Sequence, residues 1–367
     1  MKLISELERS IKTHIKLDKR HLKTFTCLII GLMTLNTVNL AKLAKLGFDD
    51  SQSTSRYRKL QRFLAKARFD YGAISKLIFH LFDFDCSPQY LTMDRTNWSL
   101  GSFEINILFL CIEWHGCAIP VIWLLLPHKG NSATKHRIAL LNRFTRLFGK
   151  SAIKRLLADR EFIGGEWFAY LVSQGIPFCI RVKKDADTTN ARGKGVQVGW
   201  LCHHLKPGER MTLSGARRLY GQLLTISAAK SPDDGQLMIV ASNVSDDGVE
   251  HYLNRWPIEC LFGCLKGKGF NFELTRLVHR VRIKKLVALL ALSYCWALKT
   301  GVWRHYEKKK IPMKNHGRKA QSFFRYGLDF IQEACLLWFA GKIKWFKQAV
   351  RLFKPKPYQP PALPDSN

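Results

Sequence analysis

The sequence predicts an α/β protein in which a mixed sheet with flanking helices is interrupted by a β-rich segment and lies between two all-helical regions. Three observations predict this fold. Residues 1 to about 85 have helical spacing without strand-like alternation, three apolar runs follow from Tyr90, and helices and strands then alternate up to Val182. The chain has 367 residues and is 47% hydrophobic, a composition that excludes a disordered protein.

Basic residues greatly outnumber acidic ones. The chain has 59 Lys and Arg against 28 Asp and Glu, a formal net charge of +31. Such a charge disfavours a compact fold unless a polyanion lies against it, so nucleic acid is the expected partner. An anionic membrane surface is the alternative, but the basic residues are spread over the chain and no segment offers about 20 uninterrupted apolar residues. Because residues 1–18 do not resemble a signal peptide, we expect a cytoplasmic, nucleoid-associated protein without a membrane span.

The first 88 residues are predicted to form a helical DNA-binding domain. Residues 39–68 have the pattern of a helix, a turn containing Gly47, and a second helix with a Ser/Thr cap. This arrangement is typical of helix-turn-helix domains, in which the second helix enters a DNA major groove. The alternative is a plain helical hairpin with a solvated basic face. The second helix carries the basic residues Arg56, Arg58, Lys59 and Arg62.

The predicted sheet begins with "YLTMD", a short strand expected to end at Asp94. Residues 103–113 and 117–126 form two longer apolar strands. After an amphipathic helix, residues 154–158 form a fourth strand that ends at Asp159. A further helix and a strand over 177–182 complete the sheet.

Changes in composition set the expected domain boundaries. Gly-rich and Pro-rich turns with alternating segments mark a β-rich insertion, and the aromatic helix that begins near Ser322 suits either multimerisation or core packing. The predicted parts are a helical domain (1–88), an α/β domain (89–183 and 244–300), the β-rich insertion (184–243), a C-terminal helical region (301–354) and a disordered tail (355–367).

Three acids are candidates for one site. Asp94 and Asp159 end predicted strands, where an open sheet binds its ligands, and Glu259 lies on a later helix that can pack across that edge. Three carboxylates at one point repel one another unless cations lie between them, and such oxygen ligands suit Mg²⁺, with Mn²⁺ as a substitute. A pair of these ions can activate a water or a 3′-hydroxyl for attack on a phosphodiester. For each acid alone, the alternative is a residue that caps a helix or opens a turn. A zinc site at Cys202, His203 and His204 is not expected, because no second pair of ligands occurs at a suitable spacing.

Glu259 belongs to a spaced set with Tyr252, Arg255 and Lys266, in the pattern Y-x2-R-x3-E-x6-K. On one continuous helix these four residues lie on the same side. A salt-bridged surface is the alternative explanation. Pro257 lies inside the set, and proline is tolerated in the first turn of a helix. The helix then begins near Arg255 and leaves Tyr252 on a preceding turn.

These motifs resemble a known family. "MDRTNW" at Asp94, "ADREF" at Asp159 and the spaced set around Glu259 are similar to those of DDE transposases of bacterial insertion sequences, in the group whose RNase H-like core carries a β-rich insertion. The resemblance covers residues 91–272 closely. It implies that Asp94, Asp159 and Glu259 form the metal-binding catalytic triad. It also implies that the other three residues of the spaced set contact DNA phosphates: Tyr252, Arg255 and Lys266.

The resemblance further implies cut-and-paste transposition. Such an enzyme binds the inverted-repeat ends of its element in double-stranded DNA, cleaves with divalent metal ions and joins the 3′-hydroxyl ends to target DNA, as a homodimer or larger assembly. An RNase H-like nuclease without strand transfer and a catalytically inactive DNA-binding repressor are the alternatives.

Two further residues are candidates for DNA contact. Relatives with a β-rich insertion commonly cut through a DNA hairpin and stack a flipped base on an aromatic side chain, and Trp200 is the only tryptophan of this insertion. A buried structural role for Trp200 is the alternative. Arg160 contacts phosphate or braces the site, unless it is a surface arginine.

Overall fold

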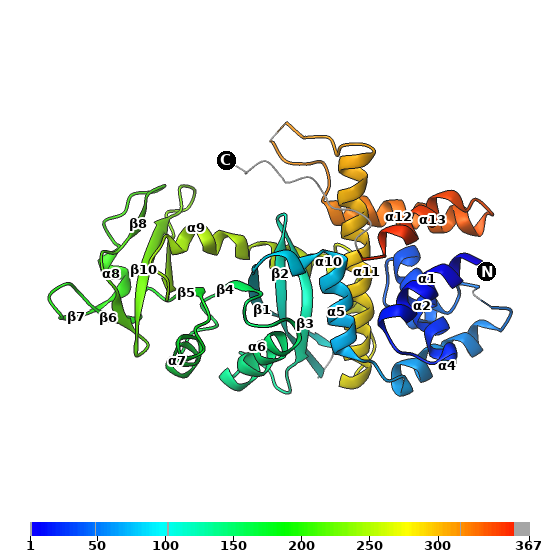
Figure 1. The fold of residues 1–367 in the computed structure, drawn as a ribbon, viewed down its shortest axis with the longest axis horizontal. Coiled ribbons are helices and arrows are strands. Elements are labelled where there is room, and N and C mark those ends of the chain that lie inside the picture. The colour runs from blue at the N-terminus through cyan, green and yellow to red at the C-terminus, as the bar shows by residue number, and fades with distance from the viewer. Residues whose placement is uncertain (1, 48, 101–102, 316, 356–367) are drawn as a thin grey trace. The chain divides into compact units, whose positions relative to one another are not determined.

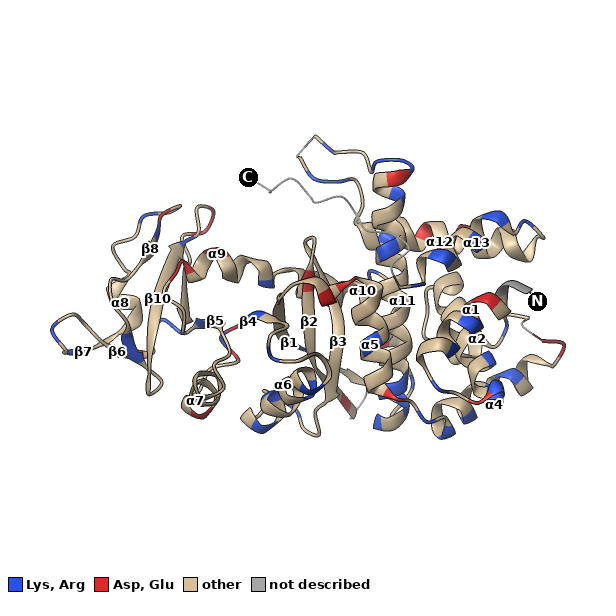
Figure 2. Ribbon diagram, viewed as in Figure 1, with Lys and Arg blue, Asp and Glu red and all other residues tan. Residues whose placement is uncertain are grey.

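The computed structural model describes residues 2–47, 49–100, 103–315 and 317–355. Residues 356–367 of the predicted tail lie outside this range. The chain divides into two compact units, of which the first comprises Met1–Cys86, Trp98–Phe103 and Leu261–Asn367, and the second Ser87–Asn97 and Glu104–Cys260 (Figure 1). Basic residues are numerous in both units, and acidic residues are far fewer (Figure 2).

The first unit contains the predicted N-terminal and C-terminal helices. The prediction that residues 1 to about 85 are helical is confirmed. The predicted Ser/Thr cap of helix α4 is wrong, because Ser53 already lies in the first turn. The cap residue is Gln52, whose side chain makes no capping hydrogen bond. The helices are α1 (Lys2–His14), α2 (Lys19–Leu35), α3 (Leu40–Leu43), α4 (Ser53–Lys66), α5 (Tyr71–Leu81), η1 (Phe84–Cys86), η3 (Phe272–Leu274), α11 (Arg280–Glu307), α12 (Phe323–Phe339) and α13 (Lys344–Leu352).

Helix α11 is the core of this unit. It is long and apolar enough to cross a membrane, but its most apolar stretch is entirely buried, as a core helix requires. Helices α2, α4, α5, α12 and α13 all contact it (Figure 1). Lys299 of α11 is buried and donates hydrogen bonds to the carbonyls of Leu81 (2.5 Å) and Lys354 (3.1 Å), so it ties the ends of α5 and α13 to the core.

Helices α11 and α12 cross with their backbones in contact. A Cβ atom on Gly327 would lie 1.8 Å from the carbonyl oxygen of Ala297, and one on Gly301 would lie 1.8 Å from that of Phe323. Only glycine permits this approach. The aromatic helix α12 therefore packs into the core, which is one of the two roles predicted for it.

The second unit is built on a mixed sheet, which confirms the predicted fold class. Its strands are β1 (Gln89–Leu100), β2 (Phe103–Trp114), β3 (Cys117–Leu125), β4 (Ile153–Ala158), β5 (Phe178–Val182), β8 (Arg210–Thr212), β9 (Arg217–Leu219), β10 (Gln222–Lys230) and β11 (Leu237–Ser242). The order is β3-β2-β1-β4-β5-β11-β10-β8, with β9 paired to β10. Strands β1, β4 and β5 are parallel, whereas β3 is antiparallel to β2 and β11 to β5. The order 3-2-1-4-5 is that of an RNase H-like core.

Two features of the sheet differ from the prediction. Strand β1 does not end at Asp94 but continues to Leu100, because it also pairs with β2, which starts only three residues later. The β-rich insertion is not wholly separate from the sheet, since β11, β10 and β8 extend it beyond β5. Only β6 (Asp187–Thr189) and β7 (Gly195–Gln197) form a sheet of their own, next to the short helix α8 (Val198–Leu201).

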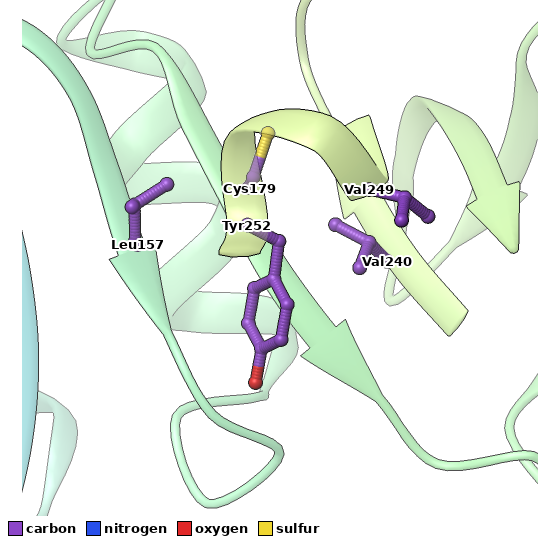
Figure 3. Packing of buried hydrophobic residues seen from close by; sticks show 5 residues of the cluster. All are labelled: Leu157, Cys179, Val240, Val249 and Tyr252. Atoms are coloured by element: carbon purple, nitrogen blue, oxygen red, sulfur yellow. The ribbon is translucent and has the colours of Figure 1, made fainter. Parts of the chain in front are cut away.

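Three helices pack on the sheet of the second unit. Helix α6 (Thr134–Phe148) contacts β3, α7 (Gly165–Ser173) contacts α6 and β10, and α9 (Gly248–Tyr252) contacts β4, β5, β10 and β11. Tyr252 at the end of α9 belongs to a buried cluster that holds this helix against the sheet (Figure 3). The other members of the cluster shown there are Leu157, Cys179, Val240 and Val249.

We predict that Gly327→Ala strongly destabilises the protein, because the added methyl group forces α12 away from α11. Thermal unfolding measures this. Gly267→Ala is the matched control, since nothing lies within 4 Å of its Cβ position. Equal melting temperatures for the two variants would contradict the close crossing.

Lys299 should make stability depend on pH. Burial lowers its pKa from 10.5 to about 7, so between these values the unfolded chain binds more protons than the folded one. The penalty for burying the charge is complete below pH 7 and declines as the pH rises toward 10.5. Relative to Lys299→Met, the wild-type protein should therefore gain stability over this range, by about 1.4 kcal/mol per pKa unit at most. Urea unfolding at several pH values measures it, and parallel pH curves would refute the assignment.

Candidate active site

The register between β1 and β4 brings two of the candidate acids together. Met93 pairs with Ala158 in the parallel ladder, and Asp94 and Asp159 are the next residue on each strand. Each carboxylate is fixed by the backbone N–H of the residue that follows it, Arg95 to Asp94 Oδ1 and Arg160 to Asp159 Oδ1, both at 2.7 Å. The two side chains therefore emerge side by side from the same edge of the sheet.

Glu259 comes from a segment that is not one continuous helix. Helix α9 ends at Tyr252, the 3₁₀ turn η2 covers Leu253–Arg255, and α10 (Pro257–Leu265) starts at the proline. The prediction of one polar stripe on a single helix is wrong, and the alternative with Pro257 in the first turn is confirmed. The Tyr252 hydroxyl, which points away from the other labelled side chains in Figure 3, donates a hydrogen bond to Asp159 Oδ1 at 3.3 Å.

Arg255 joins the remaining acids. One guanidinium nitrogen lies 3.0 Å from Asp94 Oδ2, and the other lies 3.2 Å from Glu259 Oε1. The Arg255 side chain is only 7% exposed, and its Nε is buried without a hydrogen-bond partner among the described residues. Asp94, Asp159 and Glu259 are thus linked through Arg255 and Tyr252, two residues of the same spaced set.

The negatively charged form of Asp94 is destabilised by burial and by the neighbouring carboxylates. Burial raises its pKa to about 7; the Arg95 N–H and Arg255 oppose this shift, and Glu259 and Asp159 add to it. A divalent cation would relieve both the desolvation and the repulsion. Among the described residues, no three His, Cys, Asp or Glu side chains stand close enough to hold a metal ion as they are, because Arg255 lies between Asp94 and Glu259. The donor chemistry of three carboxylates nevertheless fits Mg²⁺ or Mn²⁺.

Sequence reasoning missed the ion pair that joins strand β1, which carries Asp94, to the loop after β4, which carries Asp159. Arg95 contacts Glu161 through two parallel bonds, Nε to Oε1 at 2.9 Å and a terminal nitrogen to Oε2 at 3.0 Å. Buried Arg137 donates to the carbonyl of Glu161 at 3.0 Å and so holds the loop after β4. The signal was available, since Arg95 and Glu161 flank the aspartates in "MDRTNW" and "ADREF".

A second missed network orients α9. Arg155 of β4 forms a bidentate pair with Asp246, which also lies 3.3 Å from His251 Nε2. The other nitrogen of His251 is hydrogen-bonded to the Tyr90 hydroxyl at 2.6 Å. Since His251 precedes Tyr252, this network fixes the helix that presents Tyr252 to Asp159.

Trp200 lies in the wall of a large cavity in the insertion. The cavity measures about 780 Å³, and the tryptophan is 58% exposed, so the alternative of a buried structural tryptophan is wrong. Its ring stacks on His203, with centroids 5.7 Å apart. Cys202 lines the same cavity, but burial raises the pKa of its thiol to about 11, which disfavours the thiolate that zinc requires. The basic residues of the wall are Arg160, Arg181, Lys183, Lys184 and Lys230.

The remaining candidate residues belong to the first unit. Lys266 follows α10, pairs with Glu273 at 3.5 Å and lies 5.4 Å from the ring of the buried Trp98. On α4, Arg56 donates to the carbonyls of Ala44, Asp49 and Ser51, and Lys59 pairs with Asp49. These two residues hold the preceding turn, whereas Arg58 and Arg62 are exposed.

Comparison with known proteins places the chain in a family. Residues 110–296 match the family described as "Transposase DDE domain". A solved structure, the cryo-EM structure of the piggyBac transposase synaptic complex with hairpin DNA, is similar with a TM-score of 0.47 and 10% sequence identity, over 98% of this chain and 84% of that one. No curated protein sequence matches the chain.

Replacing Arg255 should destabilise the metal-free protein. Arg255→Met leaves buried Asp94 without a cation, and removal of one partner from a buried ion pair costs about 3 kcal/mol or more. Added Mn²⁺ should stabilise this variant more than the wild type, in which the ion must displace the guanidinium. Thermal unfolding with and without Mn²⁺ measures both effects, and exposed Arg160→Met is the control. A variant as stable as wild type and indifferent to Mn²⁺ would contradict the bridging role of Arg255.

Proposed function

Because the chain belongs to the Transposase DDE domain family, we propose that it is a cut-and-paste DNA transposase of a bacterial insertion sequence. It binds the inverted-repeat ends of the element, cleaves phosphodiester bonds and joins the 3′-hydroxyl ends to target DNA. The observation that carries the proposal is the meeting of Asp94, Asp159 and Glu259 around Arg255 and Tyr252.

The three carboxylates would hold Mg²⁺, or Mn²⁺ in its place. When bound, the ions activate the attacking oxygen and stabilise the leaving one. Asp94 and Asp159 supply the first pair of ligands because the β1–β4 register sets them side by side, and Glu259 completes the set from the first turn of α10. The Arg95–Glu161 pair keeps β1 and the loop after β4 at a fixed spacing, which preserves this geometry.

Arg255 and Tyr252 would then act on the DNA backbone. A metal ion held by Asp94 and Glu259 would replace their pairing with the guanidinium, whose unpaired Nε and terminal nitrogens suit a phosphate. The Tyr252 hydroxyl can donate to the same backbone. Lys266 is proposed as a further phosphate contact.

The cavity around Trp200 supports a role in holding a flipped base. An exposed indole stacked on His203 offers a planar surface, and five basic residues beside it, including Arg160, would attract the adjoining phosphates. Base stacking on an aromatic residue is worth roughly 1 to 3 kcal/mol. We propose that cleavage at the element end uses this pocket.

Element ends would be recognised by the N-terminal helices, and pairing of two ends calls for at least two protomers. Exposed apolar side chains around the end of α12 and the start of α13 are candidates for that contact: Leu336, Phe339, Ile343 and Trp345. We propose a cytoplasmic site of action on the nucleoid.

The proposal predicts that acid variants lose all DNA cleavage. A supercoiled plasmid that carries the gene with its flanking DNA, incubated with the protein and Mg²⁺, should release the element. Asp94→Asn, Asp159→Asn and Glu259→Gln should each reduce the rate by several orders of magnitude, because each removes a metal ligand. Release at the wild-type rate by Asp94→Asn would disprove the catalytic assignment.

The products separate the alternative functions. Joined DNA indicates a transposase, cut ends alone indicate a nuclease without strand transfer, and bound but uncut DNA indicates a repressor. Asp233→Asn is a matched control, because Asp233 is exposed in the turn between β10 and β11, away from the three acids and outside the wall of the Trp200 cavity.

A further inference from the structure

The exposed face of α4 presents a row of positive charge. Arg58, Arg62 and Lys66 follow one another at intervals of four residues and are all exposed, so they lie along one side of the helix. Like charges at this spacing repel one another and destabilise a helix. The row therefore costs stability unless an anion binds it.

Another helix supplies a basic residue to the same surface. Arg282, in the first turn of α11, lines a cavity of about 620 Å³ together with the α4 residues, and none of the described residues in its wall is acidic. Figure 2 shows Lys and Arg on α4 and at this end of α11. Ser55, Gln61 and Ala65 complete the lining. We call this concavity the α4–α11 groove.

A buried lysine fixes the width of the groove. Lys285 of α11 is 5% exposed and donates hydrogen bonds to the carbonyls of Leu64 (2.8 Å) and Ala65 (3.0 Å). These carbonyls end α4 and have no partner within the helix. Since Arg282 is three residues before Lys285, the bond that locks α4 onto α11 also sets Arg282 opposite the basic row.

The groove continues past Arg282. Arg282 and Gln61 also line an adjoining cavity of about 330 Å³, whose wall includes Arg276 and His279 from the segment before α11 and Tyr57 from α4. Basic residues from α4, from α11 and from the segment before α11 thus line two adjoining cavities. A helix that reads base edges must project into a major groove, whereas a concave path with basic residues on both sides fits a single phosphodiester backbone.

We propose that the α4–α11 groove binds the DNA backbone, with Arg282 and Lys66 as phosphate-contacting residues beside Arg58 and Arg62. This inference rests on the proposed function for its partner, double-stranded DNA. It changes the role of α4 from reading bases to positioning the duplex. Arg56 and Lys59 do not take part, because they hold the turn before α4.

Binding of full-length protein to two fluorescent duplexes, an element end and an unrelated sequence of equal length, tests the proposal. Measurements between about 50 and 200 mM salt give the number of phosphate contacts from the salt slope. Arg282→Gln should weaken binding to both duplexes by the same factor, about three- to tenfold, and reduce the slope by about 1. Lys66→Gln should behave alike, and Lys12→Gln, an exposed lysine on α1, is the control.

Each other result of these binding measurements contradicts one specific claim. Unchanged affinity and slope for both groove variants, while the wild type binds DNA, overturns the groove and leaves the proposed function intact. A loss confined to the element-end duplex overturns backbone contact in favour of base reading. Wild-type protein that binds neither duplex contradicts the proposed function itself.

Discussion

The parallel pairing of β1 with β4 fixes the position of Asp94 and Asp159, because each acid directly follows the Met93–Ala158 pair. Two carboxylates held this close repel, and burial of Asp94 adds a desolvation cost that raises its pKa. The other residues of the site stabilise the carboxylates in these positions. Tyr252 donates to Asp159, and Arg255 bridges Asp94 to Glu259. The Arg95–Glu161 pair holds the loop after β4 against β1.

The path of the chain between α9 and α10 determines how Arg255 and Glu259 reach the aspartates. A continuous helix would fix their orientation relative to Tyr252, whereas Pro257 starts a new helix and leaves Arg255 on a 3₁₀ turn. The buried ring of Tyr252 and the Arg155–Asp246–His251 network anchor the first segment to the sheet. Arg255 thereby meets two acids from different elements, and its positive charge offsets their negative charges.

Much of this arrangement could be predicted from the residues, and the exceptions have physical causes. Buried strands have long apolar runs, so the sequence predicted where β4 ends and that β2 and β3 follow one another in the sheet. Pro257 left two possibilities, one continuous helix or a helix with the proline in its first turn. The continuation of β1 beyond Asp94 depends on pairing with β2, which no local pattern records. The exposure of Trp200 and the inward contacts of Arg56 and Lys59 depend on tertiary packing, since an aromatic or basic residue has the same local signal in either place.

Anomalous X-ray diffraction from crystals of the protein with DNA and Mn²⁺ tests the central claim most directly. The account predicts manganese peaks bound by carboxylate oxygens of Asp94, Asp159 and Glu259, with the guanidinium of Arg255 withdrawn from Asp94 toward a phosphate. Manganese bound elsewhere, with the Arg255 bridge between Asp94 and Glu259 intact beside the DNA, would contradict it.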